Sequence, residues 1–238
     1  MSIREEIKEQ NKKAFRDLPF KKKIGHFWHY YKIPFFVILA ALILVAYIVL
    51  RATVFAPNPY GFSVIALNSA YCLAPSAEEV ENLMLDFAEY EKIDPNEYQV
   101  LCDVSSSIDL HSSDTYNMAV DMRIVAQGEA GELDCLIADG EIIEYYMPNQ
   151  FYQTTIDQII PPETFEYLKS KNLIYYYHDE EENKDYPLGV YIKDAPKIKE
   201  IGLYPEESNP VIAIVTLSER TQTAADFINY IFELTDAR

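Results

Sequence analysis

The sequence predicts an α/β protein in which N-terminal amphipathic and transmembrane helices precede a mostly parallel, three-layer α/β domain. Two observations support this fold class. Residues 33–50 are continuously apolar, and from Gly61 onward short β-branched runs alternate with segments whose apolar residues recur at helical spacing. We expect a basic cytoplasmic tail (1–32), the transmembrane helix (33–50), a linker (51–60) and an extracytoplasmic domain (61–238).

The apolar segment Ile33–Leu50 contains no charged residue, amide or glycine. Eighteen residues at a helical rise of about 1.5 Å reach about 27 Å, close to the hydrocarbon core of about 30 Å. The run is longer than the apolar region of a signal peptide, and Pro57 follows the small-residue site Val54–Ala56. We therefore expect an uncleaved membrane anchor.

The charge differs sharply on the two sides of this anchor. Residues 1–50 contain 9 of the 20 Lys and Arg and 4 of the 38 Asp and Glu, which leaves 11 and 34 for residues 51–238. Because basic residues beside a span mark its cytoplasmic side, we expect a single-pass cell-membrane protein with a cytoplasmic N-terminus and an extracellular C-terminal domain. The acidic domain disfavours nucleic acid or an anionic lipid surface as a partner.

The tail carries apolar residues between its basic ones, which predicts an amphipathic helix on the inner leaflet that stops or kinks at Pro19. Lys21–Lys23 and the aromatic run His26–Tyr31 suit the membrane interface. The tail is either a solvated flank without a specific partner or a docking site for another protein.

Two helical crossovers connect three predicted strands at residues 62–67, 98–104 and 133–138, which indicates a parallel sheet. The first helix is expected to begin with the capping box Ser76–Glu79, and the second at Asp114 or Thr115. Their predicted inner faces are Val80, Leu83, Met84 and Phe87 in the first helix, and Met118, Met122 and Val125 in the second.

Beyond Gly140 the pattern is less regular. Short helices are expected at residues 141–146 and 162–168, followed by a hairpin with strands at 173–177 and 188–192 and a charged tip. A central strand at 211–217 and a final helix capped at Thr223–Asp226 complete the prediction.

The sequence contains no serine-hydrolase, zinc-protease, dinucleotide-binding or P-loop motif, and seven glycines leave little room for a phosphate cradle. We expect no enzymatic activity, no cofactor and no metal site. Of the three cysteines, Cys102 and Cys135 lie in apolar runs and are expected as buried thiols. A Cys72–Cys102 disulfide remains an alternative.

Ten of the nineteen tyrosines lie between residues 145 and 204. Tyr combines an apolar ring with a hydroxyl, so this density suits either recognition of a ligand or partner or ordinary packing. Both interpretations stay open.

Small polar residues follow each of the three predicted parallel strands. Ligands of open α/β sheets bind beyond the carboxyl ends of the strands, so these residues could line one cleft. The alternative is that they are turn and capping residues. The candidate ligand-binding residues are Asn68, Ser69, Ser105, Ser106, Asp139 and Glu141.

Four segments carry a resemblance to a known family: Leu133–Asp139, Asp157–Pro161, Tyr186–Ile192 and Ala224–Phe232. Together they resemble a type 2 periplasmic-binding-protein-like domain over about residues 61–235, with a reduced second lobe at about 140–187. The run Phe27–Lys32 before a single span resembles uncharacterised anchored proteins of Gram-positive, clostridia-like bacteria.

The resemblance implies a solute-binding role. Members of the family normally have two full lobes and are either lipid-anchored or secreted, and this chain departs from both features. We expect a non-enzymatic, single-pass, extracytoplasmic module that recognises a small ligand or an envelope partner. The alternative is a structural or accessory subunit of a membrane protein complex.

Overall fold

The computed structural model describes residues 19–53, 57–74 and 76–234. The chain divides into two units, residues 1–57 and 58–238, and each is considered by itself. The predicted amphipathic helix of the tail lies outside the described residues.

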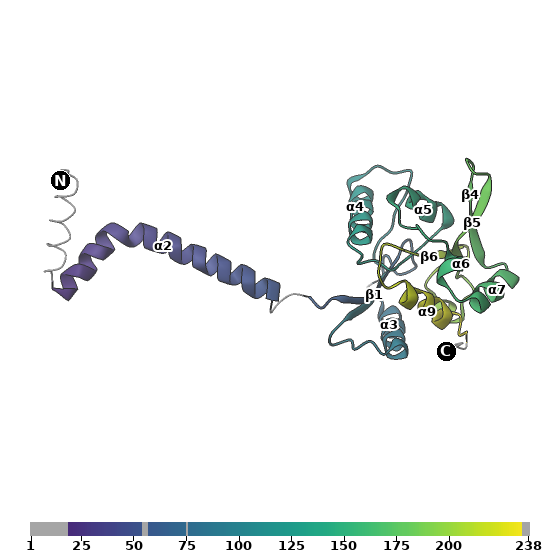
Figure 1. Ribbon diagram of the computed structural model, residues 1–238, viewed down its shortest axis with the longest axis horizontal. Coiled ribbons are helices and arrows are strands. Elements are labelled where there is room, and N and C mark those ends of the chain that lie inside the picture. The colour runs from purple at the N-terminus through teal and green to yellow at the C-terminus, as the bar shows by residue number, and fades with distance from the viewer. Residues whose placement is uncertain (1–18, 54–56, 75, 235–238) are drawn as a thin grey trace. The chain divides into compact units, whose positions relative to one another are not determined.

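Among its described residues, the first unit contains one long helix, α2, which spans Phe20–Thr53 and begins directly after Pro19 (Figure 1). The ribbon bends in the N-terminal part of α2, and Pro34 inside the helix removes one backbone hydrogen bond and crowds the preceding turn. The candidate span Lys32–Arg51 contains an 18-residue window with a mean hydropathy of 3.0, and none of that window is buried within the protein. This helix is therefore long and apolar enough to cross a membrane, in agreement with the predicted anchor.

The second unit is built on one six-stranded sheet with the order β2-β1-β3-β6-β5-β4. Strands β2, β1 and β3 are parallel, whereas β6, β5 and β4 each run antiparallel to the preceding neighbour. The predicted parallel strands and the predicted hairpin are thus confirmed, but the sheet as a whole is mixed. The strands are β1 Tyr60–Ala66, β2 Gln99–Asp103, β3 Cys135–Ala138, β4 Ile174–Asp179, β5 Lys184–Tyr191 and β6 Val211–Ile214.

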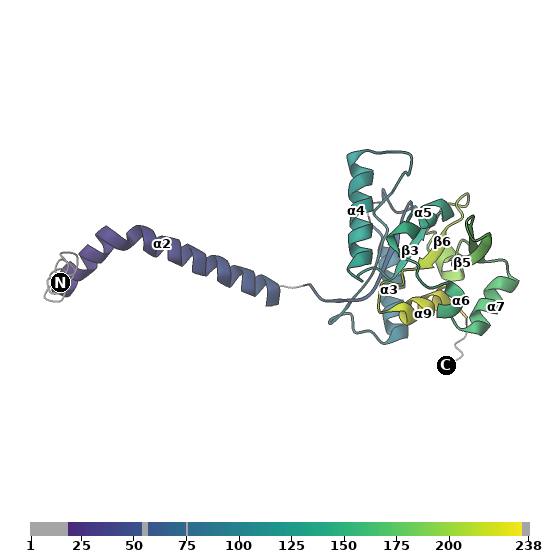
Figure 2. The same ribbon diagram turned by 45° about the horizontal axis from the view of Figure 1, so that its top comes forward.

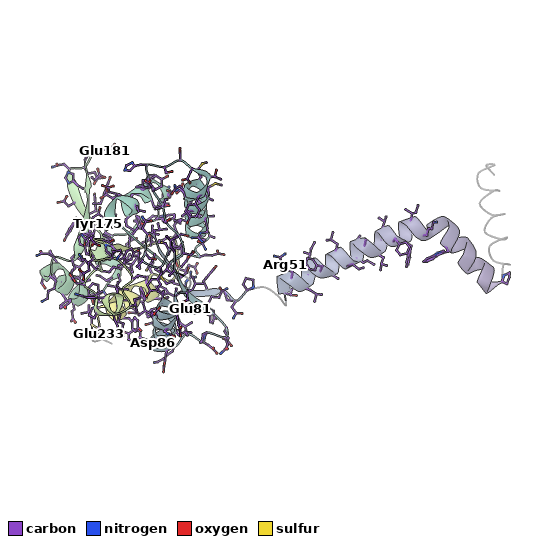
Figure 3. The ribbon with its side chains drawn as sticks, turned by 180° about the vertical axis from the view of Figure 1, so that it is seen from behind. Arg51, Glu81, Asp86, Tyr175, Glu181 and Glu233 are labelled. Carbon is purple, nitrogen blue, oxygen red and sulfur yellow. The ribbon has the colours of Figure 1, made fainter. Side chains whose placement is uncertain are left out.

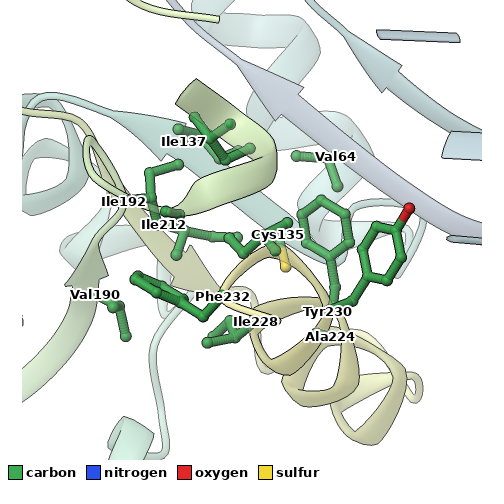
Figure 4. Close-up of a cluster of buried hydrophobic side chains, with 14 of the residues drawn as sticks. Val64, Cys135, Ile137, Val190, Ile192, Ile212, Ala224, Ile228, Tyr230 and Phe232 are labelled. Carbon is green, nitrogen blue, oxygen red and sulfur yellow. The ribbon is translucent and has the colours of Figure 1, made fainter. Parts of the chain in front are cut away.

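Helices cover both faces of the sheet, which confirms the predicted three-layer arrangement (Figure 2). Alternate residues of β1 enter two separate cores: Phe62 and Val64 join one, and Ile65 joins the other. Helices α3 and α9 pack in the first core, and α4 and α5 pack in the second. Figure 4 shows Ala224, Ile228 and Tyr230 of α9 among the strand residues of the first core. The helices are α3 Glu78–Glu91, α4 Thr115–Glu129, α5 Gly140–Tyr145, η1 Met147–Asn149, α6 Ile156–Ile159, α7 Pro162–Ser170, α8 Pro196–Glu200 and α9 Thr221–Ile231.

Two predicted helix starts are wrong. Helix α3 has Ala77 as its N-cap, without a side-chain capping bond, so Ser76–Glu79 is not a capping box. Helix α9 begins at Thr221, earlier than Thr223, because the Ser218 hydroxyl accepts from the Arg220 N–H and fixes the turn there. By contrast, Asp114 caps α4 as predicted and accepts from the Asn117 N–H at 2.8 Å.

The predicted inner face of α4 is wrong for Met118 and Met122, whereas the half-buried Val125 packs against the second core as predicted. Met118 and Met122 are 57% and 69% exposed, whereas Val120, Ile124 and Gly128 face the core. Gly128 explains this orientation, because a Cβ there would lie 2.3 Å from Cζ of Phe151. The helix approaches the core along its glycine side, and this turns the methionines outward.

Residues 140–187 do not form a lobe with a sheet of its own. They supply α5, α6 and α7, and strand β4 with the start of β5 continues the single sheet. They belong to the same compact unit as the parallel strands. The periplasmic-binding-protein-like arrangement is therefore not confirmed.

Candidate functional site

Asn68, the first predicted site residue, connects the loops that follow β1 and β2 through hydrogen bonds. Its side-chain amide donates to the Ile108 carbonyl at 3.1 Å and accepts from the Ile108 N–H at 2.8 Å. Its own N–H donates to the Ser106 carbonyl at 3.1 Å. Asn68 has φ +56°, a left-handed conformation that Asn tolerates better than most residues. Its polar atoms therefore bond to the protein itself.

Ser69 and Ser106 are buried beside Asn68 and are likewise bonded internally. The Ser69 hydroxyl donates to the Val104 carbonyl at 3.0 Å and accepts from the Tyr71 N–H at 3.1 Å. The Ser106 hydroxyl accepts from Nη2 of Arg123 at 2.7 Å. The Ser69 hydroxyl both donates and accepts within the protein, and the Ser106 hydroxyl is held by Arg123, so these two serines stabilise the loops.

Ser105 is exposed and bonds to Asp103 at the end of β2, with 2.6 Å between its hydroxyl and Oδ1. Nη1 of Arg123, on α4, lies 2.8 Å from Oδ2 of the same carboxylate. Burial raises the pKa of Asp103, but the hydrogen bonds from Ser105 and the charge of Arg123 outweigh it and hold the pKa below its usual value. This cluster fastens α4 to the end of β2.

Tyr204, which sequence reasoning did not assign to the site, fills the space between the ends of β1 and β3. Its hydroxyl lies 2.8 Å from the Leu67 carbonyl and 3.1 Å from the Ile137 carbonyl. Burial raises its pKa well above the usual value. From β1 the chain continues to β2 on one side and then to β3 on the other, so the strand order reverses between β1 and β3. In open α/β sheets, ligands bind at such a point, beyond the carboxyl ends of the strands. In this protein the side chain of Tyr204 occupies that position.

The segment that contains Tyr204 is attached to the loop after β1 by two further bonds. The Ala70 N–H donates to the Leu203 carbonyl at 2.9 Å, and the Tyr71 hydroxyl donates to the Ile201 carbonyl at 2.6 Å. Tyr204 belongs to the predicted tyrosine cluster, but its partner residues lie 137 and 67 positions away, so no local pattern could identify them.

Asp139 and Glu141, at the start of α5, are exposed. Asp139 is the N-cap of α5 but makes no side-chain capping bond. The hydroxyl of Tyr175, which is labelled in Figure 3, bonds to Glu144 of α5. The Tyr175 ring occupies the space that a side chain at Gly140 would need. Together with Ser105, these two carboxylates are the predicted site residues that face solvent, where they can accept bonds from a donor or a cation.

The opposite, amino end of the parallel strands contains a fully buried carboxylate, Asp134, which sequence reasoning also missed. It accepts from the Ser63 N–H at 2.8 Å, from the Ser218 hydroxyl, and from Nε of Arg220, which lies 3.0 Å from Oδ1. Arg220 donates further to the Gly131 carbonyl at 2.9 Å. Burial raises the pKa of Asp134. The network joins β1, β3 and the turn before α9.

All three cysteines are free, so the alternative Cys72–Cys102 disulfide is not formed. Cys135 is buried as predicted, and Cys102 is half-buried with a pKa raised to about 12 by burial and by Asp103. Among the described residues, no group of three or more His, Cys, Asp and Glu side chains could hold a metal ion.

The tyrosines divide between packing and the surface. Tyr146 is fully buried against the Phe151 ring, and the rings of Tyr175 and Tyr191 contact each other edge to face. Tyr145 and Tyr176 remain exposed. Packing therefore accounts for part of the cluster, and the exposed rings are available to a partner.

Comparison of the chain with protein-family models, with curated proteins and with solved structures found no match.

Proposed function

We propose that this chain is a single-pass membrane protein whose acidic α/β domain acts outside the cell as a structural or accessory subunit in an assembly of membrane proteins. The carrying observation is the helical segment Lys32–Arg51, whose 18-residue apolar window has a mean hydropathy of 3.0 and is not buried within the protein. In water this exposure is costly, and in a bilayer it is favourable. The basic tail and acidic domain support a cytoplasmic N-terminus.

A short connection supports a position of the domain next to the membrane. The Asn58 side chain donates to the Asn96 carbonyl at 2.6 Å, and the Gln99 N–H donates to the Pro59 carbonyl at 2.9 Å. The folded unit therefore begins at Asn58, and α2 ends at Thr53. The intervening residues 54–57 extend at most about 18 Å, so a membrane-embedded α2 keeps the domain near the bilayer.

The carboxyl end of the sheet supports an assembly role more than capture of a small ligand. Asn68, Ser69 and Ser106 are engaged within the protein, and Tyr204 occupies the position between β1 and β3. The surface instead exposes large apolar side chains such as Met118 and Met122, which suit contact with another protein. A small-ligand receptor is the second candidate, and it would depend on the exposed Ser105, Asp139 and Glu141.

The topology can be tested by protease treatment of intact cells that express the full chain with a different epitope at each end. We expect loss of the C-terminal epitope and protection of the N-terminal one until the cells are permeabilised. A C-terminal epitope that survives on intact cells would contradict the outside position of the domain.

The assembly role can be tested by chemical cross-linking of the full chain in its native membrane, with a variant lacking residues 58–238 as control. We expect discrete higher-mass species that require the domain. A parallel thermal-shift screen against sugars, amino acids and peptides tests the receptor alternative. Saturable stabilisation by a small molecule, with no cross-linked species, would replace the assembly role with the receptor role.

A further inference from the structure

Three aromatic side chains and a lysine share one face of α2 at the start of the candidate span. Lys32 follows Trp28 by four residues, and Phe35 and Phe36 follow Lys32 by three and four, which is the spacing of neighbours on one side of a helix. The Trp28 ring centroid lies 6.4 Å from that of Phe35 and 5.8 Å from that of Phe36. We define the α2 aromatic face as these three rings together with Lys32.

The α2 aromatic face is exposed at the edge of the apolar segment. Trp28, Phe35 and Phe36 are 51%, 40% and 52% exposed, and Lys32 is exposed as well. Lys32 is the first residue of the candidate span Lys32–Arg51. Aromatic rings and lysine side chains favour the layer between hydrocarbon and water, where the lipid headgroups lie. In the proposed single-pass arrangement, this layer belongs to the cytoplasmic leaflet.

The positive charge of Lys32 is not compensated within its own helix. The sequence of α2, Phe20–Thr53, contains no Asp or Glu, and Lys32 makes no salt bridge with any residue that the structure describes. Residues 1–19 carry five basic and four acidic residues, so they have no excess of negative charge. The 34 acidic residues of the domain follow the span and, in the proposed arrangement, lie across the membrane. An anion for Lys32 therefore comes from the bilayer.

The bend of α2 shapes the surface around Lys32. Pro34 follows Lys32 by two residues, which at about 3.6 residues per turn places it on the opposite side of the helix. The Pro34 ring crowds the carbonyl of the preceding turn, so the helix opens on the proline side and bends toward the other side. The α2 aromatic face therefore lies on the concave side of the bend that the ribbon shows (Figure 1). A concave surface with a cation between rings suits the headgroup of a single lipid.

We propose that the α2 aromatic face binds the headgroup of an anionic phospholipid in the cytoplasmic leaflet. The Lys32 ammonium donates to the lipid phosphate, and the rings beside it contact the glycerol backbone and the upper acyl chains. A negatively charged lipid is preferred, because Lys21–Lys23 precede the face in the sequence and add to the positive charge near it. This inference rests on the proposed membrane anchoring and adds a specific class of lipid to it.

Trp28 is the single tryptophan of the chain, so tryptophan fluorescence reports on this face. The test reconstitutes the full chain into mixed bilayers of phosphatidylcholine and phosphatidylglycerol, with bromine atoms on the acyl chains of only one of the two lipids. Bromine quenches tryptophan at close range, so the quenching measures which lipid lies against Trp28. We expect brominated phosphatidylglycerol to quench more strongly, with a preference of about fivefold for one lysine at an anionic headgroup.

Four variants locate the source of this preference. Lys32→Gln should remove most of it, and Lys32→Arg should retain it. Arg51→Gln is the matched control, because it removes a cation at the other end of the span and should leave the preference unchanged. Replacement of Lys21–Lys23 by glutamine measures the general attraction of basic residues to an anionic surface, and it should lower the preference less than Lys32→Gln does. Circular dichroism checks that each variant keeps its helix.

Equal quenching by the two lipids would overturn the proposal and leave the anchoring intact. A preference that Lys32→Gln leaves unchanged, or that depends only on Lys21–Lys23, would also overturn it. Quenching by neither lipid would overturn it as well, and the protease experiment on intact cells then separates the two causes. An extracellular domain in that experiment would show that a protein covers the face, whereas an internal domain would show that the anchoring itself fails.

Discussion

The two ends of the parallel strands are closed in different ways. At the amino end, a fully buried carboxylate, Asp134, is held by Ser63, Ser218 and Arg220 from three parts of the chain. At the carboxyl end, the single hydroxyl proton of Tyr204 faces two main-chain carbonyls, those of Leu67 and Ile137. The amino end thus depends on a buried carboxyl group and its three partners, and the carboxyl end depends on a large aromatic side chain.

This difference separates structural polar groups from those available for binding. The general rule for α/β sheets directs attention to the carboxyl end. There Tyr204 and the internally bonded Asn68, Ser69 and Ser106 leave Ser105, Asp139 and Glu141 at the surface. The most deeply buried charge lies at the other end, where it stabilises the fold and is distant from solvent.

The largest expected effect is at the amino end. Asp134→Ala removes the acceptor of the Ser63 N–H and the Ser218 hydroxyl and leaves Arg220 without its carboxylate. We expect the free energy of unfolding to fall by about 3 kcal/mol, because buried partners are left unpaired. Urea unfolding of the full chain in detergent, followed by tyrosine fluorescence, measures the change.

Asp139→Ala is the matched control, since it removes an exposed carboxylate at the opposite end of the same strand. Its effect should stay within about 0.5 kcal/mol. If Asp134→Ala and Asp139→Ala lowered the free energy of unfolding equally, the amino and carboxyl ends of the strands would not differ in how much their carboxylates stabilise the fold.

The parallel half of the domain could be predicted because its signals are local. A few neighbouring residues are enough to recognise each of these signals: the apolar runs in β1 and β3, the buried stripe of α3 and the Asp114 cap of α4. The mixed half could not be fully predicted, because the antiparallel pairing of β6 with β3 joins residues more than seventy positions apart. Nothing in the local pattern of either strand gives its direction.

The positions of the candidate site residues in the loops after the strands could be predicted, but the hydrogen-bond partners of those residues could not. Asn68, Ser69 and Ser106 lie where the strand pattern placed them, yet their bonding partners Ile108, Val104 and Arg123 come from other segments. The rotation of α4 was missed for a similar reason. Its buried side is set by the contact between Gly128 and Phe151, which the helical periodicity of α4 does not contain.

A smaller effect is expected at the carboxyl end from Tyr204→Phe. The variant keeps the ring but removes the hydroxyl that lies within bonding distance of the Leu67 and Ile137 carbonyls. We expect a loss of about 1 to 2 kcal/mol, measured by the same urea titration, because a buried acceptor is left without its donor. Tyr176→Phe, at an exposed ring, serves as the control and should show almost no change. A loss that equals or exceeds that of Asp134→Ala would reverse the ranking of the two ends.

The smallest effect is a difference in pH dependence between Asp103 at the carboxyl end and Asp134 at the amino end. The lowered pKa of Asp103 gives stability that is present above about pH 4 and is lost as the pH falls through the folded-state pKa. The raised pKa of Asp134 gives a contribution that is complete below about pH 4 and is lost as the pH rises through the folded-state pKa.

The unsubstituted chain should therefore have a higher free energy of unfolding than Asp103→Asn, and this difference should shrink, by at most about 1 kcal/mol, as the pH falls below about 4. The difference in free energy of unfolding between the unsubstituted chain and Asp134→Asn should instead shrink as the pH rises above about 4. Urea titrations of the three proteins from about pH 3 to pH 7 measure both trends. Trends of the same sign would show that the two carboxylates are held in the same way, because only opposite shifts of pKa on folding give opposite slopes.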